Sequence, residues 1–494
     1  IVNEFSGGLK DPSALRDYVK YIYDEALSNG ELLPKYLLLF GDTSYDPKGI
    51  IKNGLTNHVI TYESKESVHR TGTFGTDDYF AYLDDNEGNF GNGGTSDSFL
   101  MDIGIGRIPV QTSSEARAYI SKLKTYENPK NKGAWQSLVT FAADDDFPKP
   151  LENKDLHTFN ADLSAEMMNV NEPGIRIKKI YEFSYPIEIN GTGRQIPEAT
   201  KDLMSTINNG TLVLSYLGHG NEQTLTDEEL FTSDYITDFT NKDKLCVLIT
   251  ATCQFGRYDD TGAQSGAEKF VLATNGGAIA SFTTTRVVYT GSLIGTNTNF
   301  ALSIALSQKM SERNPDGTPK RLGDIAMQTK NTILAGFNSR IGASLNNKKF
   351  VLLGDPASVF QLPSKRAQLS SISNIDVLSQ DTLITVRALD TIELSGAILD
   401  ANGATDTQYN GQSSVTIYDA RRSISLPERS WINNPQTDCN LDDCEYSIES
   451  DILFKGKANV VNGEFTLPVI IPKDISSSAN TGRVLLYAEA DGKT

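Results

Sequence analysis

Short apolar runs alternate with helical patterns along residues 1 to about 363, and this alternation constrains the fold more than any other feature. Continuous runs rich in β-branched residues are typical of parallel strands that are covered on both faces. The alternation therefore predicts an α/β sheet with crossover helices. The predicted strands are YLLLFGD (36–42), SLVTFAAD (137–144), TLVLSYLG (211–218), LCVLITAT (245–252), GAIASFT (277–283) and FVLLGD (350–355). The predicted helices span about 12–29, 113–127, 154–169, 196–209, 263–274, 292–309 and 321–335.

The pattern changes after QLPSKRAQ (361–368), where helical periodicity ends. From there to residue 494 short strands are separated by Gly, Asn and Asp turns, which predicts an all-β module, most simply a β-sandwich. A polar segment, ENPKNKGAW (127–135), also interrupts the α/β part. We therefore expect three units: an α/β subdomain at 1–130, a second α/β subdomain at 131–365, and a β-sandwich at 366–494 that is truncated at its end.

The formal net charge of −18 argues against nucleic acid as a partner, because binding phosphates needs a basic face. No apolar run approaches the roughly 18 residues of a membrane span, and no signal peptide is visible. The chain opens at Ile1 without a methionine, and we expect it to be a piece of a longer protein.

The stretch LVLSYLGHGN (212–221) sets His219 between two glycines at the end of a predicted strand, and Cys253 follows the next predicted strand. Ligands gather at the carboxyl ends of strands in parallel α/β sheets. If the two strands are neighbours, the imidazole and the thiol face one crevice. A thiolate is a strong nucleophile, and a nearby histidine can lower the thiol pKa or protonate a leaving amine. The backbone N–H groups of Gly220 and Cys253 are candidate oxyanion donors.

Each of these residues also has a plainer interpretation. His219 alone could be a loop histidine without a role, and Cys253 alone could be a small buried hydrophobe. Cys246 begins its strand, at the opposite edge, and we expect it in the core. No zinc site is predicted, because the remaining histidines form no cluster with cysteine: His58, His69 and His157.

Two polar stretches leave alternatives open. Cys439 and Cys444 in TDCNLDDCEY either form a small disulfide ring, as in extracytoplasmic proteins, or remain free thiols. The acidic residues around them, and the Asp and Asn residues of DDNEGNFGNGG (84–94), could hold a structural calcium ion, although the second stretch lacks a full EF-hand loop and is also compatible with a plain loop.

The motifs LSYLGHGN and LCVLITATCQFGRYDD together resemble the His-Gly and Cys signature of the clan that holds caspases, legumains and gingipains. The closer similarity is to the gingipain-type C25 cysteine peptidases. It extends to FGTDDYFAYLDD (74–85), DIGIGRIPVQTSSEARAYISKLKTYE (102–127) and FVLLGDPAS (350–358), and covers nearly the whole chain. The resemblance implies a caspase- and gingipain-like α/β sandwich in two subdomains, followed by an immunoglobulin-like β-sandwich module.

The same resemblance implies a role for individual residues. His219 becomes the general acid/base, Cys253 the nucleophile, and the N–H groups of Gly220 and Cys253 the oxyanion hole. Asp77 falls where arginine-specific members place the carboxylate of the primary substrate pocket, and Glu63 is a candidate to orient the histidine. Asp77 could instead cap a turn, and Glu63 could lie on the surface. No cofactor is required and no catalytic metal is implied.

Within the family, the chain is most similar to the sortases of the type IX secretion system. This implies an extracytoplasmic enzyme at the cell surface, in the bacterial outer membrane, that removes the C-terminal sorting domain of secreted cargo through a Cys thioester. It implies transfer of the cargo to an amine of anionic lipopolysaccharide, and an outer-membrane β-barrel as a partner. The alternatives are a gingipain-like endopeptidase that hydrolyses proteins after a basic residue, and a catalytically idle scaffold that docks a partner. A further hypothesis is that loop 255–266, after the nucleophile, gates access.

Overall fold

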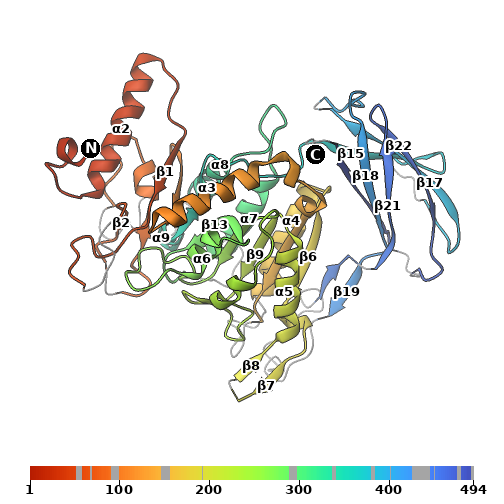
Figure 1. Ribbon diagram of the computed structural model, residues 1–494, viewed down its shortest axis with the longest axis horizontal. Helices are drawn as coiled ribbons and strands as arrows, with labels where there is room; N and C mark the ends of the chain where they lie inside the picture. Colours follow the sequence, from red (N-terminus) through yellow and green to blue (C-terminus); the bar gives the residue numbers. More distant parts are fainter. Residues whose placement is uncertain are drawn as a thin grey trace.

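An eight-stranded sheet forms the centre of the computed structural model (Figure 1). The structure describes residues 1–51, 58–66, 69–90, 99–145, 156–191, 193–288, 298–336, 341–379, 384–400, 402–425, 445–449, 451–475 and 480–490. In spatial order the strands are β1 (Tyr36–Phe40), β4 (Gly104–Ile108), β14 (Phe350–Leu353), β13 (Ala278–Thr284), β12 (Cys246–Ala251), β9 (Val213–Leu217), β5 (Leu138–Ala143) and β6 (Arg176–Tyr181). All six predicted apolar runs are strands of this sheet, which confirms the predicted α/β class.

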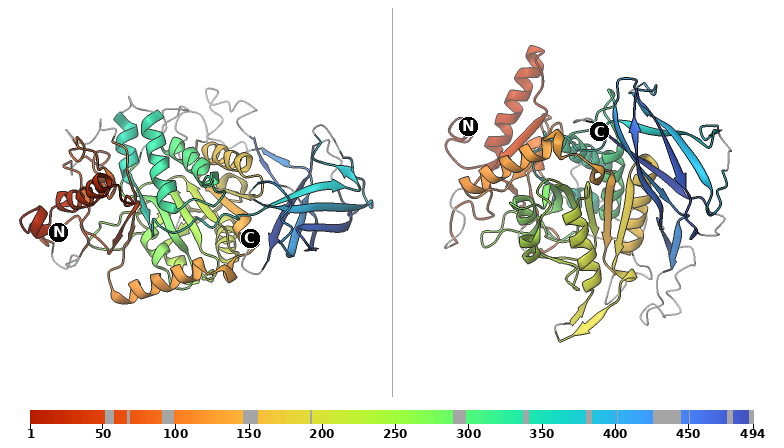
Figure 2. Two further views of the ribbon diagram at one scale, coloured as in Figure 1. Left: turned by 90° about the horizontal axis from the view of Figure 1, so that it is seen from above. Right: turned by 45° about the vertical axis from the view of Figure 1, so that its right-hand side comes forward.

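Helices cover the sheet on both faces. Helices α4, α7 and α8 pack side by side on one face, whereas α3 and α6 lie on the other (Figure 2). The bounds are α1 (Val2–Phe5), α2 (Pro12–Asn29), α3 (Ser113–Glu127), α4 (Leu156–Asn171), α5 (Pro197–Asn209), α6 (Gly266–Leu272), α7 (Thr298–Ser311), α8 (Leu322–Gly336) and α9 (Ile341–Lys349). Of these helices and the others in the described residues, none is both long and apolar enough to cross a membrane.

Local signals define the ends of the best-predicted helices. The Asp11 side chain accepts a hydrogen bond from the Ser13 N–H at the start of α2, and Gly30 ends that helix with φ +67°, a conformation that favours glycine. A reciprocal pair of hydrogen bonds between Thr112 and Glu115 caps the start of α3. Both helices accordingly begin and end where the sequence pattern predicts.

The direction of β14 differs from the prediction of a parallel strand. β14 runs antiparallel to β13, with Ser281 opposite Leu353, and parallel to β4. The sheet therefore consists of two parallel groups, β1–β4–β14 and β13–β12–β9–β5–β6, that meet in an antiparallel pair. The sequence pattern could not reveal this, because an apolar run has the same composition in either direction.

The described residues form three hydrophobic clusters. The largest surrounds the central strands and their helices, from Ile108 to Leu362, and also includes Tyr446. A second cluster, rich in aromatic rings, lies around Tyr79, Phe80 and Phe90 near β1 and α2. The third fills the C-terminal region. Each part of the chain thus has its own apolar core.

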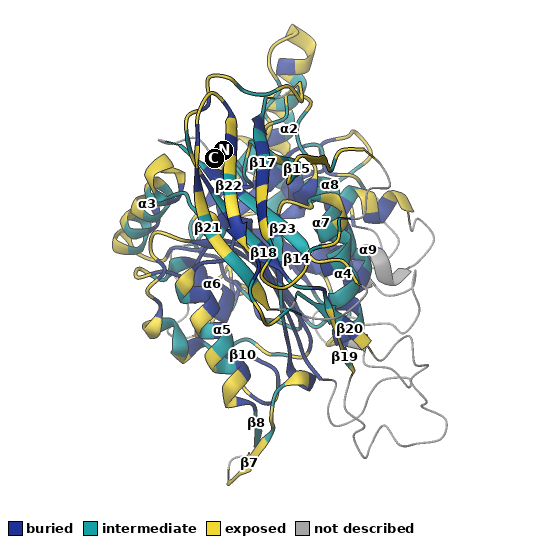
Figure 3. Cartoon of the chain, turned by 90° about the vertical axis from the view of Figure 1, so that its right-hand side faces the viewer, coloured by how far each residue is buried: buried dark blue, intermediate teal, exposed yellow. Residues whose placement is uncertain are grey.

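The C-terminal region is an antiparallel β-sandwich, as predicted. One sheet holds β16 (Ile375–Asp376), β15 (Arg366–Ile372), β17 (Thr391–Leu399) and β22 (Glu464–Ile470), and the other β21 (Ile452–Val460), β18 (Gly411–Tyr418) and β23 (Arg483–Glu489). Buried and exposed residues alternate along β17, as expected for a strand with one face on a core (Figure 3).

A hairpin of β19 (Arg422–Ser425) and β20 (Glu445–Ile448) reaches from the sandwich to the α/β part. The Tyr446 ring packs against Tyr181 with a centroid separation of 4.8 Å, and Lys179 Nζ donates to the Ser447 carbonyl at 2.7 Å. These contacts join the sandwich to the edge strand β6.

Candidate active site

The sheet places His219 and Cys253 at the same edge. Strands β9 and β12 are parallel neighbours, with Leu217 opposite Ala251. His219 and Cys253 each follow two residues later, and adjacent strands lie about 4.8 Å apart. The register therefore places both residues at the carboxyl ends of two neighbouring strands. Cys246 begins β12 at the other edge and is 1% exposed.

Gly220 brings the two turns into direct contact. A Cβ atom at this residue would lie 2.6 Å from Thr252 Oγ1 and 2.8 Å from the Thr224 carbonyl oxygen, which is closer than real Cβ contacts allow. Only glycine fits without a shift of the neighbouring backbone. The turn that carries His219 thus packs against the residue that precedes Cys253.

The backbone of His219 is held from both sides, while its side chain is exposed. Its N–H donates to Asp144 Oδ2 at 2.8 Å, and its carbonyl oxygen accepts from the Tyr216 hydroxyl at 2.6 Å and the Thr226 N–H at 3.1 Å. The ring lies 5.0 Å, between centroids, from the buried ring of His157 on α4.

Sequence reasoning missed Asp144 and His157 as neighbours of His219. A signal existed for Asp144, because it ends the predicted strand 137–144, whose carboxyl end lies at this same edge. His157 carries no comparable signal, since it lies on a helix that only the tertiary packing brings to His219.

Cys253 is half-buried, and its Sγ lies 4.0 Å from the Val288 carbonyl oxygen. Burial raises the pKa of this thiol, and the positive charges of Arg70 and Lys349 offset the rise in part. The neutral thiol is therefore favoured at neutral pH, and a base is needed to form a thiolate at this position. His219 is the imidazole that the neighbouring strand presents.

The residue after the thiol has a strained backbone. Gln254 adopts φ +61°, a conformation uncommon outside glycine, and its side chain donates to Glu222 Oε1 at 3.0 Å. Strained residues of this kind cluster at functional sites because the surrounding structure must hold them in place. The sharp turn sets the thiol at the end of β12.

Glu63 lies at a different place from the one predicted for a residue that orients His219. It belongs to the short strand β2 (Tyr62–Glu63), and its Oε2 pairs with Arg286 at 3.3 Å. Arg286 also binds the fully buried carboxylate of Asp259. Burial, followed by the charge of Asp259, raises the pKa of Glu63 well above its usual value. Within the described part of the chain no hydrogen bond joins Glu63 to His219.

Asp77 is engaged in a buried ion pair. Its Oδ1 and Oδ2 accept from Arg107 Nη2 and Nε, each at 2.8 Å, and Oδ1 also accepts from the Thr61 hydroxyl. Arg107 is fully buried and Asp77 is 4% exposed. A substrate guanidinium would have to displace Arg107 to reach this carboxylate. The next residue, Asp78, pairs with Lys330.

The gating hypothesis for loop 255–266 is wrong, because the loop is packed into the molecule. Phe255, Tyr258 and Asp259 are at most 1% exposed, and Ser265 caps α6 through Glu268. A segment that anchors three buried side chains is part of the scaffold.

Other sequence predictions lie partly or wholly outside the described residues. These are the Cys439–Cys444 pair with its acidic neighbours and residues 91–94 of the stretch 84–94. Cys246 and Cys253, which the structure does describe, are free thiols.

Comparisons with known proteins give a family model and several solved structures. The family model of peptidase family C25 matches residues 1–360. The crystal structure of the Arg-specific cysteine proteinase gingipain R (RgpB) aligns with a TM-score of 0.53 and 15% identity, over 99% of this chain and 89% of that one. A complex of the Porphyromonas gingivalis RgpB pro- and mature domains gives a TM-score of 0.52 and 15% identity, over 99% and 91%. Dimeric latent PorU from Porphyromonas gingivalis gives a TM-score of 0.41 and 22% identity, over 99% of this chain and 38% of that one. A search among curated proteins finds no match.

Proposed function

The chain belongs to peptidase family C25, and we propose that it is a cysteine endopeptidase and transpeptidase. In this proposal it lies at the cell surface, in the bacterial outer membrane, and cuts the C-terminal sorting domain from secreted cargo. In this proposal Cys253 is the nucleophile and His219 the general acid/base. The observation that carries it is the register of β9 and β12, which sets both residues two positions beyond a matched strand end.

The reaction follows from these groups. His219 takes the thiol proton as Cys253 Sγ attacks the scissile carbonyl carbon, and the N–H groups of Gly220 and Cys253 stabilise the oxyanion. The imidazolium then gives its proton to the leaving amine of the sorting domain, which leaves a thioester on Cys253. An amine of anionic lipopolysaccharide then attacks the thioester carbonyl, forms an amide bond with the cargo and loses a proton to His219. The C–S bond breaks, and His219 returns this proton to the sulfur of Cys253.

The environment of Asp77 favours the sortase over a protease that cleaves after arginine. The charge of Asp77 is matched by Arg107, and both of its carboxylate oxygens already accept hydrogen bonds. This leaves no carboxylate at that position for a basic substrate side chain.

A product assay by mass spectrometry tests the function. Wild type, Cys253→Ala and the matched control Cys246→Ala are each mixed with a cargo protein that carries its sorting domain, plus a glycine amide as acceptor. The proposal predicts cargo cut near the domain junction and joined to the amine in wild type and in the Cys246 variant only. Cleavage without amine transfer would show a hydrolase and refute the transpeptidase. Equal cleavage by the Cys253 variant would refute the nucleophile.

A further inference from the structure

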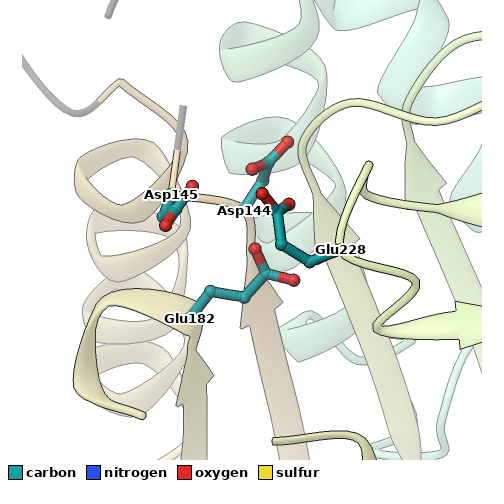
Figure 4. Close-up of side chains that lie close together, drawn as sticks. All are labelled: Asp144, Asp145, Glu182 and Glu228. Atoms are coloured by element: carbon teal, nitrogen blue, oxygen red, sulfur yellow. The ribbon is translucent and has the colours of Figure 1, made fainter. Parts of the chain in front are cut away.

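Four buried carboxylates converge beside the candidate active site (Figure 4). Asp144 and Asp145 follow β5, Glu182 opens the turn η5 (Glu182–Ser184) after β6, and Glu228 lies in the loop between β10 (Thr224–Leu225) and β11 (Phe231–Thr232). One oxygen from each lies within 4.8 Å of the others, and none of the four residues is more than 3% exposed. We call this set the carboxylate cluster.

A cationic side chain, that of Arg194, contacts two members of the carboxylate cluster. Arg194, on β8 (Gly193–Gln195), binds both oxygens of Asp145 and donates to Glu228 Oε1 at 2.7 Å. Buried charge of one sign is unfavourable unless a proton or a cation neutralises it. Burial and the neighbouring carboxylates raise the pKa of Glu182 well above its usual value and that of Glu228 to about 7.

The side chain of Glu182 provides a second observation, separate from the clustering of the carboxylates, that indicates a bound ligand. It is fully buried, and no donor in the described residues makes a hydrogen bond of normal geometry to either of its oxygens. The Thr226 hydroxyl lowers the pKa of Glu182, but less than burial and the neighbouring carboxylates raise it. Figure 4 shows the Glu182 carboxylate directed toward the other three. A buried carboxylate without donors among the described residues is neutralised by a proton or by a bound cation.

We propose that the carboxylate cluster binds a calcium ion. All of its potential ligands are oxygen atoms, which suit a hard cation and not zinc or copper. Ca²⁺ accepts six to eight oxygens and tolerates one or two from each carboxylate, as four carboxylates from three separate loops would supply. Mg²⁺ fits less well, because it demands a near-ideal octahedron and keeps several of its waters.

The calcium site would also order the active site. Asp144 belongs to the carboxylate cluster, and its Oδ2 accepts the His219 N–H. Its own N–H donates to the Leu217 carbonyl at 3.2 Å, at the end of the strand that carries the histidine. An ion that fixes Asp144 therefore fixes the backbone on both sides of Gly218.

Calorimetric titration of the chelator-treated chain with CaCl₂ tests the site. The variants are Glu182→Gln and a matched control, Glu229→Gln, which changes an exposed glutamate of the same loop as Glu228. We expect Glu182→Gln to bind one Ca²⁺ fewer per chain than wild type and the control variant. Equal stoichiometry in all three proteins, or no binding by wild type, would overturn the proposal.

Thermal unfolding separates loss of the site from loss of the fold. Without Ca²⁺, Glu182→Gln should melt at or above the Tm of wild type, because the neutral amide removes a buried charge. With Ca²⁺, wild type and Glu229→Gln should gain stability that Glu182→Gln does not. If Glu182→Gln melts well below wild type, Glu228→Gln takes its place with the same expected loss. A gain in Tm from MgCl₂ but none from CaCl₂ would refute the choice of ion.

Discussion

Substitution of Asp77 distinguishes a structural role of this residue, in its ion pair with Arg107, from a role in substrate specificity. Asp77→Asn is nearly isosteric and keeps Oδ1 as an acceptor for the Thr61 hydroxyl and Arg107 Nη2. It replaces Oδ2, which accepts from Arg107 Nε at 2.8 Å, with an amide group that cannot accept. The variant therefore leaves the guanidinium of Arg107, which is fully buried, without its counter-charge.

Removal of one partner from a buried ion pair costs about 3–5 kcal/mol, because the other charge stays uncompensated. Carbonyl groups of Gly41, Val59 and Ile60 also accept from Arg107, and they keep the loss toward the lower end of that range. We therefore expect Asp77→Asn to lower the free energy of unfolding by about 3 kcal/mol. Urea denaturation followed by circular dichroism measures it.

Asp17→Asn is the matched control, because Asp17 pairs with Arg16 at 3.3 Å while its side chain stays 49% exposed. Its loss should be no more than about 1 kcal/mol, as for other exposed pairs. If Asp77→Asn left the free energy of unfolding unchanged and abolished cleavage after arginine, Asp77 would be a pocket carboxylate and the structural interpretation would be refuted.

Two further predictions concern the active-site turns. Gly220→Ala should reduce peptidase activity at least tenfold, because the new Cβ collides with Thr252 Oγ1 and the Thr224 carbonyl oxygen; tenfold corresponds to about 1.4 kcal/mol in activation free energy. Adding Thr252→Ala removes one of the two collisions and should restore part of kcat/KM. If the double variant recovered no activity, this account of the packing would be contradicted. Burial raises the pKa of the Cys253 thiol, so its reaction rate with iodoacetamide should level off at a higher pH than the rate of free cysteine does. Peptide mass mapping at a series of pH values measures this rate. A rate that is already maximal at neutral pH would show a thiolate–imidazolium pair instead.

Local patterns in the sequence account for the strands and helices that surround the active site. The runs ending at His219 and Cys253 could be recognised because central strands, covered on both faces, contain few polar residues. Strand β6, with the sequence RIKKIY, was not predicted, because an edge strand carries lysines that its half-exposed position tolerates. Helix α9 was missed for a related reason, since its sequence IGASLNNKK has no clear apolar stripe.

The partners of the acidic residues could not be predicted, because they come from distant parts of the chain. Asp77 and Arg107 are 30 positions apart, and Glu63 and Arg286 are 223 apart. Nothing local marks such a pair. The carboxylate cluster was missed for the same reason, although Asp144 and Asp145 were visible at a strand end, since Glu182 and Glu228 reach them only through the sheet and its loops.

Trapping the covalent intermediate tests the central claim most directly. Wild type, His219→Ala, Cys253→Ala and Cys246→Ala are mixed with cargo, quenched in acid after short times, and examined by intact-mass and peptide mass spectrometry. We predict an adduct with the mass of cargo lacking its sorting domain, attached to Cys253 in wild type and in the Cys246 variant, strongly reduced without His219 and absent without Cys253. Cargo processed at the wild-type rate by the Cys253 variant, or an adduct on another residue, would contradict the account.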